Sequence, residues 1–295
     1  DVWAMDVARF GDYASPQYGT IKSSENYERR FIMTFPNETL PKGRKQKTTA
    51  LYDRFVNQGA VMGDSFGLEN VLWFANNKED AHEEPTIKRS RSHDYVSKEV
   101  INVRENVGLI EVANFSKHEF KGPDARKFLD HIMAGRLPKP GRISLSPMLS
   151  YRGKLCGDLT VACLDENEFM VFGSGAAQEM HRRWFESHLD KFNLSYSNRS
   201  DEYHGLSIAG PNSRKVLEKI VRDDVSNEKF KFRDSRRMFV GGVPAIINRI
   251  SFTGELGYEI YVAPHYQLKL YEELMEAGKE FNIKPFGGRA LMSMR

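Results

Sequence analysis

The segments FKGPDARKFLDHI (120–132) and IAGPNSRKVLEKI (208–220) decide the predicted fold, because one pattern occurs in both. They share Gly, Pro, Arg, Lys, Leu and Ile in register. Each is interpreted as a strand end, a Gly-Pro turn and an amphipathic helix, since Pro is tolerated in a first helical turn. The repeat predicts two related α+β halves, each with a helix packed on an antiparallel or mixed sheet. Chance similarity between two strand-to-helix turns is the alternative.

Hydrophobic spacing predicts the elements around this repeat. Val96, Val100 and Val103 recur at helical spacing, and Gly108 ends the pattern, which predicts a helix. The other expected elements are strands within 109–120, 143–150, 155–164 and 168–175, helices near 175–190 and 265–278, and a hairpin over 238–252 that turns at Gly241 and Gly242.

The first part of the chain lacks this clear periodicity. Residues 1–85 predict short strands and a brief helix near 48–57, so they are interpreted as an irregular connector that precedes a folded domain at 86–295. The chain begins with Asp, and GGRALMSMR (287–295) stops within a helical pattern. We therefore expect a fragment of a longer protein, with the second domain incomplete at its C-terminus.

Composition narrows the classes of partner. The 43 basic and 40 acidic residues give a net charge of +3, which does not favour a nucleic-acid partner. No apolar run approaches the roughly 18 residues of a membrane span, and no signal peptide opens the sequence. Cys156 and Cys163 lie at odd spacing on one predicted strand, which favours opposite faces and no disulfide. This pattern favours a reducing compartment, the cytoplasm or, in a eukaryote, the mitochondrial matrix.

The sequence lacks the common catalytic motifs that would indicate a function. The sequence has no P-loop, HExxH or GxSxG motif, and its histidines are scattered, so no metal site is expected. FGSGAA (172–177) follows a predicted strand and opens a predicted helix, as phosphate-binding turns do, but Gln178 breaks the dinucleotide fingerprint. A structural turn is the favoured interpretation.

Two carboxylates interrupt apolar strands. Asp158 lies inside GKLCGDLTVACL (153–164), and Glu259 lies in the apolar arm of ISFTGELGYEIY (250–261). A buried carboxylate is costly unless it is paired, so each needs a structural partner or a ligand, and the pattern alone leaves both open. Glu255, in the turn, is expected to be solvated.

Several motifs resemble one family. RISFTGELGYEIY (249–261) resembles the YTGE-x-G-aromatic-E motif of the folate-binding aminomethyltransferase fold, which occurs in the glycine-cleavage T-protein and in the C-terminal half of dimethylglycine and sarcosine dehydrogenases. SPMLSYRGKLCGDLTV (146–161) resembles the strand pair of that family. Residues 30–75 resemble the region joining the flavin and folate domains of the dehydrogenases, and residues 1–11 resemble the tail of the flavin domain. The dehydrogenases are therefore the nearer members.

This resemblance implies a two-step chemistry. A flavin domain outside this chain would use FAD to oxidise an N-methylated glycine, and the folate domain would use tetrahydrofolate to capture the carbon as 5,10-methylenetetrahydrofolate. By motif match, Asp158 is the catalytic carboxylate beside the folate amines, Glu259 pairs with the pterin, and Glu255 fixes the turn. The implied partners are a small-molecule amine and the protein's own flavin domain. The fragment alone is not expected to bind FAD.

The chain also departs from the family pattern. Phe252 replaces a usual Tyr, which keeps ring stacking but removes a hydroxyl, and Met292 stands where other members carry Asp or Asn. Arg289 is a candidate for contacting the anionic glutamate tail of folate. Two alternatives remain open: a non-catalytic folate-fold binding module, and a stand-alone aminomethyltransferase or demethylase of the T-protein family.

Overall fold

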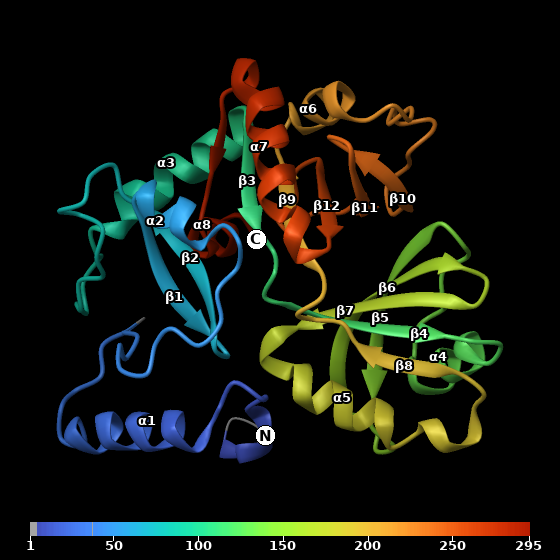
Figure 1. Ribbon diagram of the computed structural model, residues 1–295, viewed down its shortest axis with the longest axis horizontal. Helices are drawn as coiled ribbons and strands as arrows, with labels where there is room; N and C mark the ends of the chain where they lie inside the picture. The colour runs from blue at the N-terminus through green and yellow to red at the C-terminus, as the bar shows by residue number, and fades with distance from the viewer. Residues whose placement is uncertain (1–4, 37) are drawn as a thin grey trace.

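Two β-sheets, the larger above the smaller in Figure 1, form one side of the molecule, and the N-terminal elements lie on the other. The structure is a computed structural model that describes residues 5–36 and 38–295. The larger sheet has the strand order β10-β11-β12-β9-β3-β13, and the smaller has the order β5-β6-β7-β4-β8. The larger sheet contains β3 (Val107–Glu111), β9 (His204–Ala209), β10 (Ser235–Val240), β11 (Val243–Asn248), β12 (Gly257–Val262) and β13 (Ile283–Pro285). The smaller contains β4 (Phe115–Lys121), β5 (Arg142–Leu149), β6 (Leu155–Asp165), β7 (Glu168–Ser174) and β8 (Ser195–Asn198).

Each sheet carries helices on its outer face because apolar residues recur on one side of those helices. Helices α6 (Ser213–Ile220) and α7 (Gln267–Gly278) bury Val216, Leu217, Leu270 and Leu274 in the core of the larger sheet. Helices α4 (Ala125–Ile132) and α5 (Gln178–Glu186) bury Phe128, Leu129 and Phe185 in that of the smaller. The α+β architecture expected from the repeat is confirmed.

The two Gly-Pro units share their backbone geometry. Gly122 has a φ of 133° and Gly210 a φ of 128°, values that essentially only glycine adopts. Each glycine is also crowded by backbone: a Cβ on Gly210 would lie 2.4 Å from the carbonyl oxygen of Val103, and one on Gly122 would lie 2.8 Å from the Cα of Leu194. The glycines therefore set how each strand turns into its helix.

The inner faces of the two sheets pack against each other. Ala162 and Phe172 of the smaller sheet share one apolar core with Ile246 and Tyr261 of the larger. The rings of Phe172 and Tyr261 are stacked, with centroids 4.5 Å apart. This stack joins the two halves at the centre of the fold.

The N-terminal part of the chain is more regular than its sequence indicated. It contains α1 (Pro16–Glu28), which begins at a Ser15 cap and was not predicted, whereas the brief helix predicted near 48–57 is confirmed as α2 (Tyr52–Asn57). Only Tyr18 and Glu25 of α1 are buried, so the helix has no apolar stripe that periodicity could detect. The other elements are α2 and the hairpin of β1 (Ala60–Ser65) and β2 (Leu68–Phe74), which in Figure 1 lie beside α3 (Ser92–Glu105) and α8 (Gly288–Met294).

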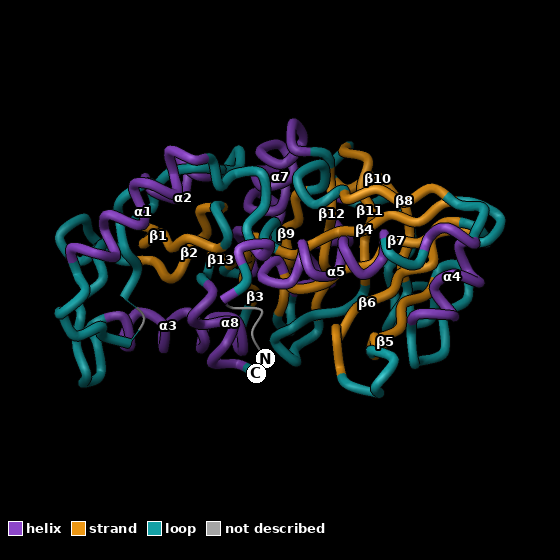
Figure 2. Tube along the Cα trace, turned by 90° about the horizontal axis from the view of Figure 1, so that it is seen from below, coloured by secondary structure: helices purple, strands orange, loops and turns teal. Residues whose placement is uncertain are grey.

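Other local predictions were confirmed or corrected. The hairpin does turn at Gly241 and Gly242, both with positive φ. The stretch 109–120 enters two strands, β3 and β4, that belong to different sheets, and Figure 1 shows the chain passing from one to the other. Figure 2 shows most strands of these two sheets on one side of the molecule and helices α1 and α3 on the other. Both cysteines are free, but they contact the same core rather than opposite faces, because a bulge at the start of β6 shifts Cys156. Among the described residues, no helix has the length and apolarity needed to cross a bilayer.

Candidate functional site

Glu259 is a buried carboxylate with little compensation. It lies on the central strand β12 and is 9% exposed. Tyr261 donates a hydrogen bond to it over 2.9 Å, and no cationic side chain in the described residues pairs with it. Burial raises the pKa of the Glu259 carboxyl to about 7.

Comparison with a partly buried acid, Glu99, shows why Glu259 is unusual. Burial also raises the pKa of Glu99 to about 7, but its two oxygens accept hydrogen bonds from the backbone N–H groups of Phe74 and Gly287. Each oxygen of the Glu99 carboxylate therefore has a hydrogen-bond donor within the fold. Within residues 5–36 and 38–295, Glu259 has one hydrogen-bond donor, Tyr261, for a group that can accept about four hydrogen bonds.

A row of buried polar side chains crosses the larger sheet at Glu259. Strand pairing places Ser235, Asn248, Glu259 and Ser207 directly next to one another on β10, β11, β12 and β9. All four are buried, and the row continues to Ile110 on β3. Neighbours in a row share one face of a sheet, and Ile110 belongs to the core between the sheets. The polar row therefore faces the smaller sheet.

Asp158 lies on the facing side of the smaller sheet. Along β6 it shares a face with Thr160 and Ala162, and Ala162 belongs to the core between the sheets. Asp158 is exposed, and Leu145, which pairs with Thr160, is 62% exposed. The facing surface is thus open at Asp158.

The central stack relates the two acids. Thr160 pairs with Phe172, so Asp158 lies two residues along β6 from the Phe172–Tyr261 stack. Glu259 lies two residues along β12 from the same stack, on the same face as Tyr261. The two acids therefore lie on the two surfaces that meet at this stack. Glu259 is buried, and Asp158 is exposed to solvent.

Phe252 lines a cavity of about 200 Å³ next to this region. Ile110, which extends the polar row, lines the same cavity, as does Phe115 at the start of β4. The guanidinium of Arg295 lies 4.1 Å from the centroid of the Phe252 ring. The further lining residues include Glu111, Asn114, Phe286, Leu291 and Met292.

The other two candidates are occupied by protein partners. Glu255 is ion-paired rather than simply solvated: it lies 2.6 Å from Arg104 of α3, and Ser251 and Thr253 hold its backbone. Arg289 pairs with Glu83 over 2.9 Å and lines a surface groove. The structure thus brings Phe252 and Met292 to one cavity but engages Glu255 and Arg289 elsewhere.

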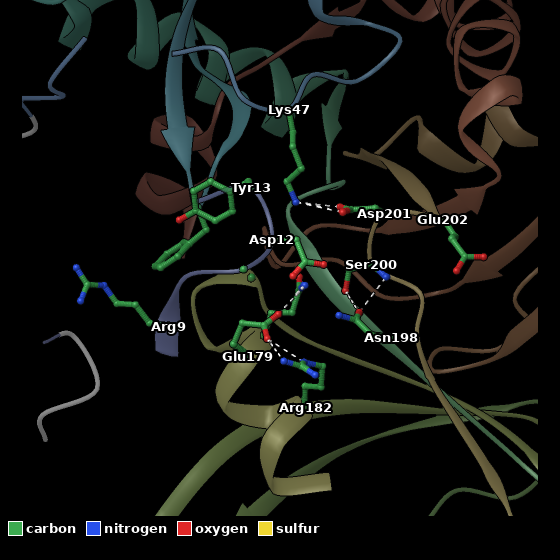
Figure 3. Close-up of a pocket in the computed structure, with 14 residues that line it drawn as sticks. Arg9, Asp12, Tyr13, Lys47, Glu179, Arg182, Asn198, Ser200, Asp201 and Glu202 are labelled. Atoms are coloured by element: carbon green, nitrogen blue, oxygen red, sulfur yellow. Dashed lines mark hydrogen bonds and ion pairs between the residues drawn. The ribbon is translucent and has the colours of Figure 1, made fainter. Parts of the chain in front are cut away.

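A second hollow, of about 400 Å³, lies between residues 9–13 and one end of the smaller sheet (Figure 3). Two of its cationic side chains are paired within the protein, Arg182 with Glu179 and Lys47 with Asp201. None of the residues predicted for the site lines it. The hollow includes Gly175 and Gln178 of the FGSGAA turn, and its Lys47 and Arg182 side chains are already paired with carboxylates, which does not favour a phosphate there.

Sequence reasoning missed three residues beside the candidates: Asn248, Tyr261 and Arg295. Their contacts depend on strand pairing or on distant packing, which residue spacing along the chain does not reveal. The only available signal was an Asn and a Tyr in otherwise apolar strands.

Comparison with known proteins identifies the family of the chain. The family described as GCVT N-terminal domain matches residues 51–295. The chain belongs to this family. Residues 1–49 match a second family, the FAD dependent oxidoreductase central domain.

Curated relatives and solved structures extend the match. The mitochondrial dimethylglycine dehydrogenase of Mus musculus is 33% identical over the whole chain, which spans 34% of that protein. An aminomethyltransferase of Thermoanaerobacter pseudethanolicus is 30% identical over 65% of the chain and 53% of its own length. The glycine cleavage system aminomethyltransferase T of Bartonella henselae shares the fold, with a TM-score of 0.69 and 22% identity over 84% of this chain and 62% of that one. The chain thus spans about a third of the dehydrogenase.

Proposed function

We propose that this GCVT domain binds tetrahydrofolate, with Glu259 holding the pterin ring and Asp158 acting where the one-carbon unit is transferred. The observation that carries the proposal is the buried Glu259 carboxylate, which has one protein donor and no cation among the described residues. Such a group is stabilised when a ligand supplies further N–H donors.

The residues present fit this ligand. A pterin offers a ring N–H and an adjacent amino group, and a carboxylate accepts two parallel hydrogen bonds from such an edge. The phenol of Tyr261 holds one carboxylate oxygen in place. Phe252 offers an aromatic face within the neighbouring cavity. Glu259 and Phe252 would therefore orient the ring.

Asp158 suits a different task because it is open to approach. The chemistry that tetrahydrofolate supplies when bound is a nucleophilic nitrogen that captures a one-carbon unit as 5,10-methylenetetrahydrofolate. A carboxylate beside that nitrogen accepts a hydrogen bond from it and stabilises developing positive charge. Asp158 is exposed on the surface that faces the sheet of Glu259, so a ligand nitrogen can approach it. The carboxylate could then accept the hydrogen bond and stabilise the positive charge.

The proposal extends to the complete protein. The match of residues 1–49 to an FAD oxidoreductase family supports a flavin domain as the partner that oxidises an N-methylated glycine of the dimethylglycine or sarcosine type. This step would produce the one-carbon unit that the GCVT domain accepts. In a eukaryote the protein would work in the mitochondrion, as the names of its relatives state for them.

Two variants of the complete protein separate the roles. Glu259→Gln is expected to weaken tetrahydrofolate binding, measured by calorimetry, by about 10-fold or more, because one acceptor becomes a donor facing the ring N–H groups. Asp158→Asn is expected to keep binding within about twofold but to slow methylenetetrahydrofolate formation by about 100-fold.

Glu99→Gln is the matched control, since it changes a partly buried acid whose pKa is also raised but whose hydrogen-bond partners lie within the fold. Unchanged affinity in Glu259→Gln removes Glu259 from the site. Equal product formation by Asp158→Asn and parent removes the role of Asp158. A parent protein that binds tetrahydrofolate without forming product would be the non-catalytic binding module.

A further inference from the structure

Asn248 is the immediate neighbour of Glu259, and half of its amide is unused. It is 0% exposed and lies directly opposite Glu259 in the β11–β12 pair. Among the described residues its Nδ2 has no hydrogen-bond partner, and no hydrogen bond joins it to Glu259. A fully buried amide donor without a partner is rare in folded proteins and calls for a physical reason.

The orientation of this amide is fixed from the other side. The hydroxyl of Ser235, the next residue in the polar row, donates to Asn248 Oδ1 over 2.7 Å. Oδ1 is thereby engaged on the β10 side of Asn248, and Glu259 is its neighbour on the opposite side, on β12. Ser235 therefore presents the NH₂ group of Asn248 as the free end.

Asn248 and Glu259 together form an ordered set of hydrogen-bonding groups. Directly opposed residues of an antiparallel pair have Cβ atoms about 4.5–5.5 Å apart. The buried face thus offers one donor, from Asn248, followed by the two acceptor oxygens of Glu259. A planar edge that carries an acceptor followed by two donors is complementary to this set.

We infer that Asn248 reads the 4-oxo group of the bound pterin and is a specificity-determining residue of the site. This inference rests on the proposed function. The edge of a 4-oxo pterin presents its carbonyl oxygen, its ring N3–H and its 2-amino group in that order. The carbonyl accepts from Asn248 Nδ2 while the two donors bind Glu259, which satisfies the unpartnered donor and the under-used carboxylate together.

The test compares tetrahydrofolate with its 4-amino analogue, tetrahydroaminopterin, on the complete protein. Asn248→Ala is expected to weaken tetrahydrofolate binding by about 10-fold, because the carbonyl loses its donor. Binding of the 4-amino analogue should change by less than about twofold. Asn248→Asp, which replaces the donor by an acceptor, should shift the ratio of the two affinities towards the 4-amino analogue by about 100-fold.

The design separates folding from recognition. The 4-amino analogue also alters the ring nitrogen that faces Glu259, so each ligand is compared between parent and variant rather than with the other ligand. Retained binding of the analogue shows that a variant is folded. Ser235→Ala, which releases the amide, should reproduce part of the Asn248→Ala effect on tetrahydrofolate alone.

Equal losses for both ligands in Asn248→Ala would overturn the inference and leave the proposed function intact, because Asn248 would then act only in the fold. Unchanged binding of both ligands would overturn it as well. A parent protein that binds neither ligand would instead overturn the proposed function, and the inference with it.

Discussion

At the scale of single residues, the burial of Glu259 opposes its ionisation. The pKa of this carboxyl is raised from 4.5 to about 7, with burial as the main cause. The folded state therefore binds more protons than the unfolded state between these two pH values, and stability falls as pH rises through that window. Ionising the buried carboxyl lowers the stability of the ligand-free protein. Hydrogen bonds donated by a ligand would offset part of this unfavourable free energy, so Glu259 would favour the bound state.

Glu259→Gln should therefore stabilise the ligand-free protein at high pH. A pKa shift of this size lowers the free energy of unfolding of the wild-type protein by about 3 kcal/mol at pH 8, where the carboxyl is ionised in both the folded and the unfolded state. At pH 5 the difference is less than about 1 kcal/mol. Urea unfolding at the two pH values measures the difference. A variant that is less stable than wild type at pH 8 would show that the carboxylate is already satisfied within the protein.

The site residues that could be predicted from the sequence are those whose polarity differs from that of the strand around them. Asp158 and Glu259 stood out because each is an acid in an apolar run, and the family resemblance supplied a ligand. Asn248 did not, because its relation to Glu259 comes from the register of β11 against β12. The ion pair of Glu255 with Arg104 likewise joins residues far apart in the sequence.

At the scale of elements, the two Gly-Pro units depend on their glycines. Gly210→Ala is expected to cost about 3 kcal/mol or more, because the φ of 128° excludes other residues and the new Cβ would meet the carbonyl oxygen of Val103 at 2.4 Å. Gly242→Ala is the matched control: its φ is 76° and no atom lies within 4 Å of a new Cβ. That change should cost only about 1 kcal/mol.

Urea unfolding of the two variants compares these costs. Equal losses would mean that the close approach at Gly210 relaxes and that the shared geometry of the repeat is not needed. A larger loss for Gly210→Ala would show that the repeat is a structural requirement as well as a similarity in sequence.

Elements were predictable where one face of a helix or strand is apolar. Helices α3, α4, α6 and α7 follow their hydrophobic spacing, and the hairpin follows its glycine pair. Helix α1 was missed because it buries only two residues. The division of 109–120 between two sheets was missed because both halves have strand-like patterns, and only tertiary packing separates them.

At the scale of the whole molecule, the site depends on how the two sheets meet. Phe172→Ala removes the ring that stacks on Tyr261, and we expect a loss of about 3–5 kcal/mol in stability. It should also weaken tetrahydrofolate binding, since it loosens the contact between the surfaces that carry Asp158 and Glu259.

Phe169→Ala is the control, because Phe169 is equally large but packs in the core beneath α4 and α5. It should cost similar stability, measured by urea unfolding, and leave the affinity of the folded protein nearly unchanged. If both variants lose affinity alike, the contact between the sheets has no special part in binding.

The most direct test of the account is a crystal structure of the complete protein with 5-formyltetrahydrofolate, a stable reduced folate. We expect the ring N3 and the 2-amino nitrogen to lie within about 3.2 Å of the Glu259 oxygens, with Asp158 facing the same ligand. A pterin bound elsewhere, or a Glu259 carboxylate that still accepts only from Tyr261, would contradict it.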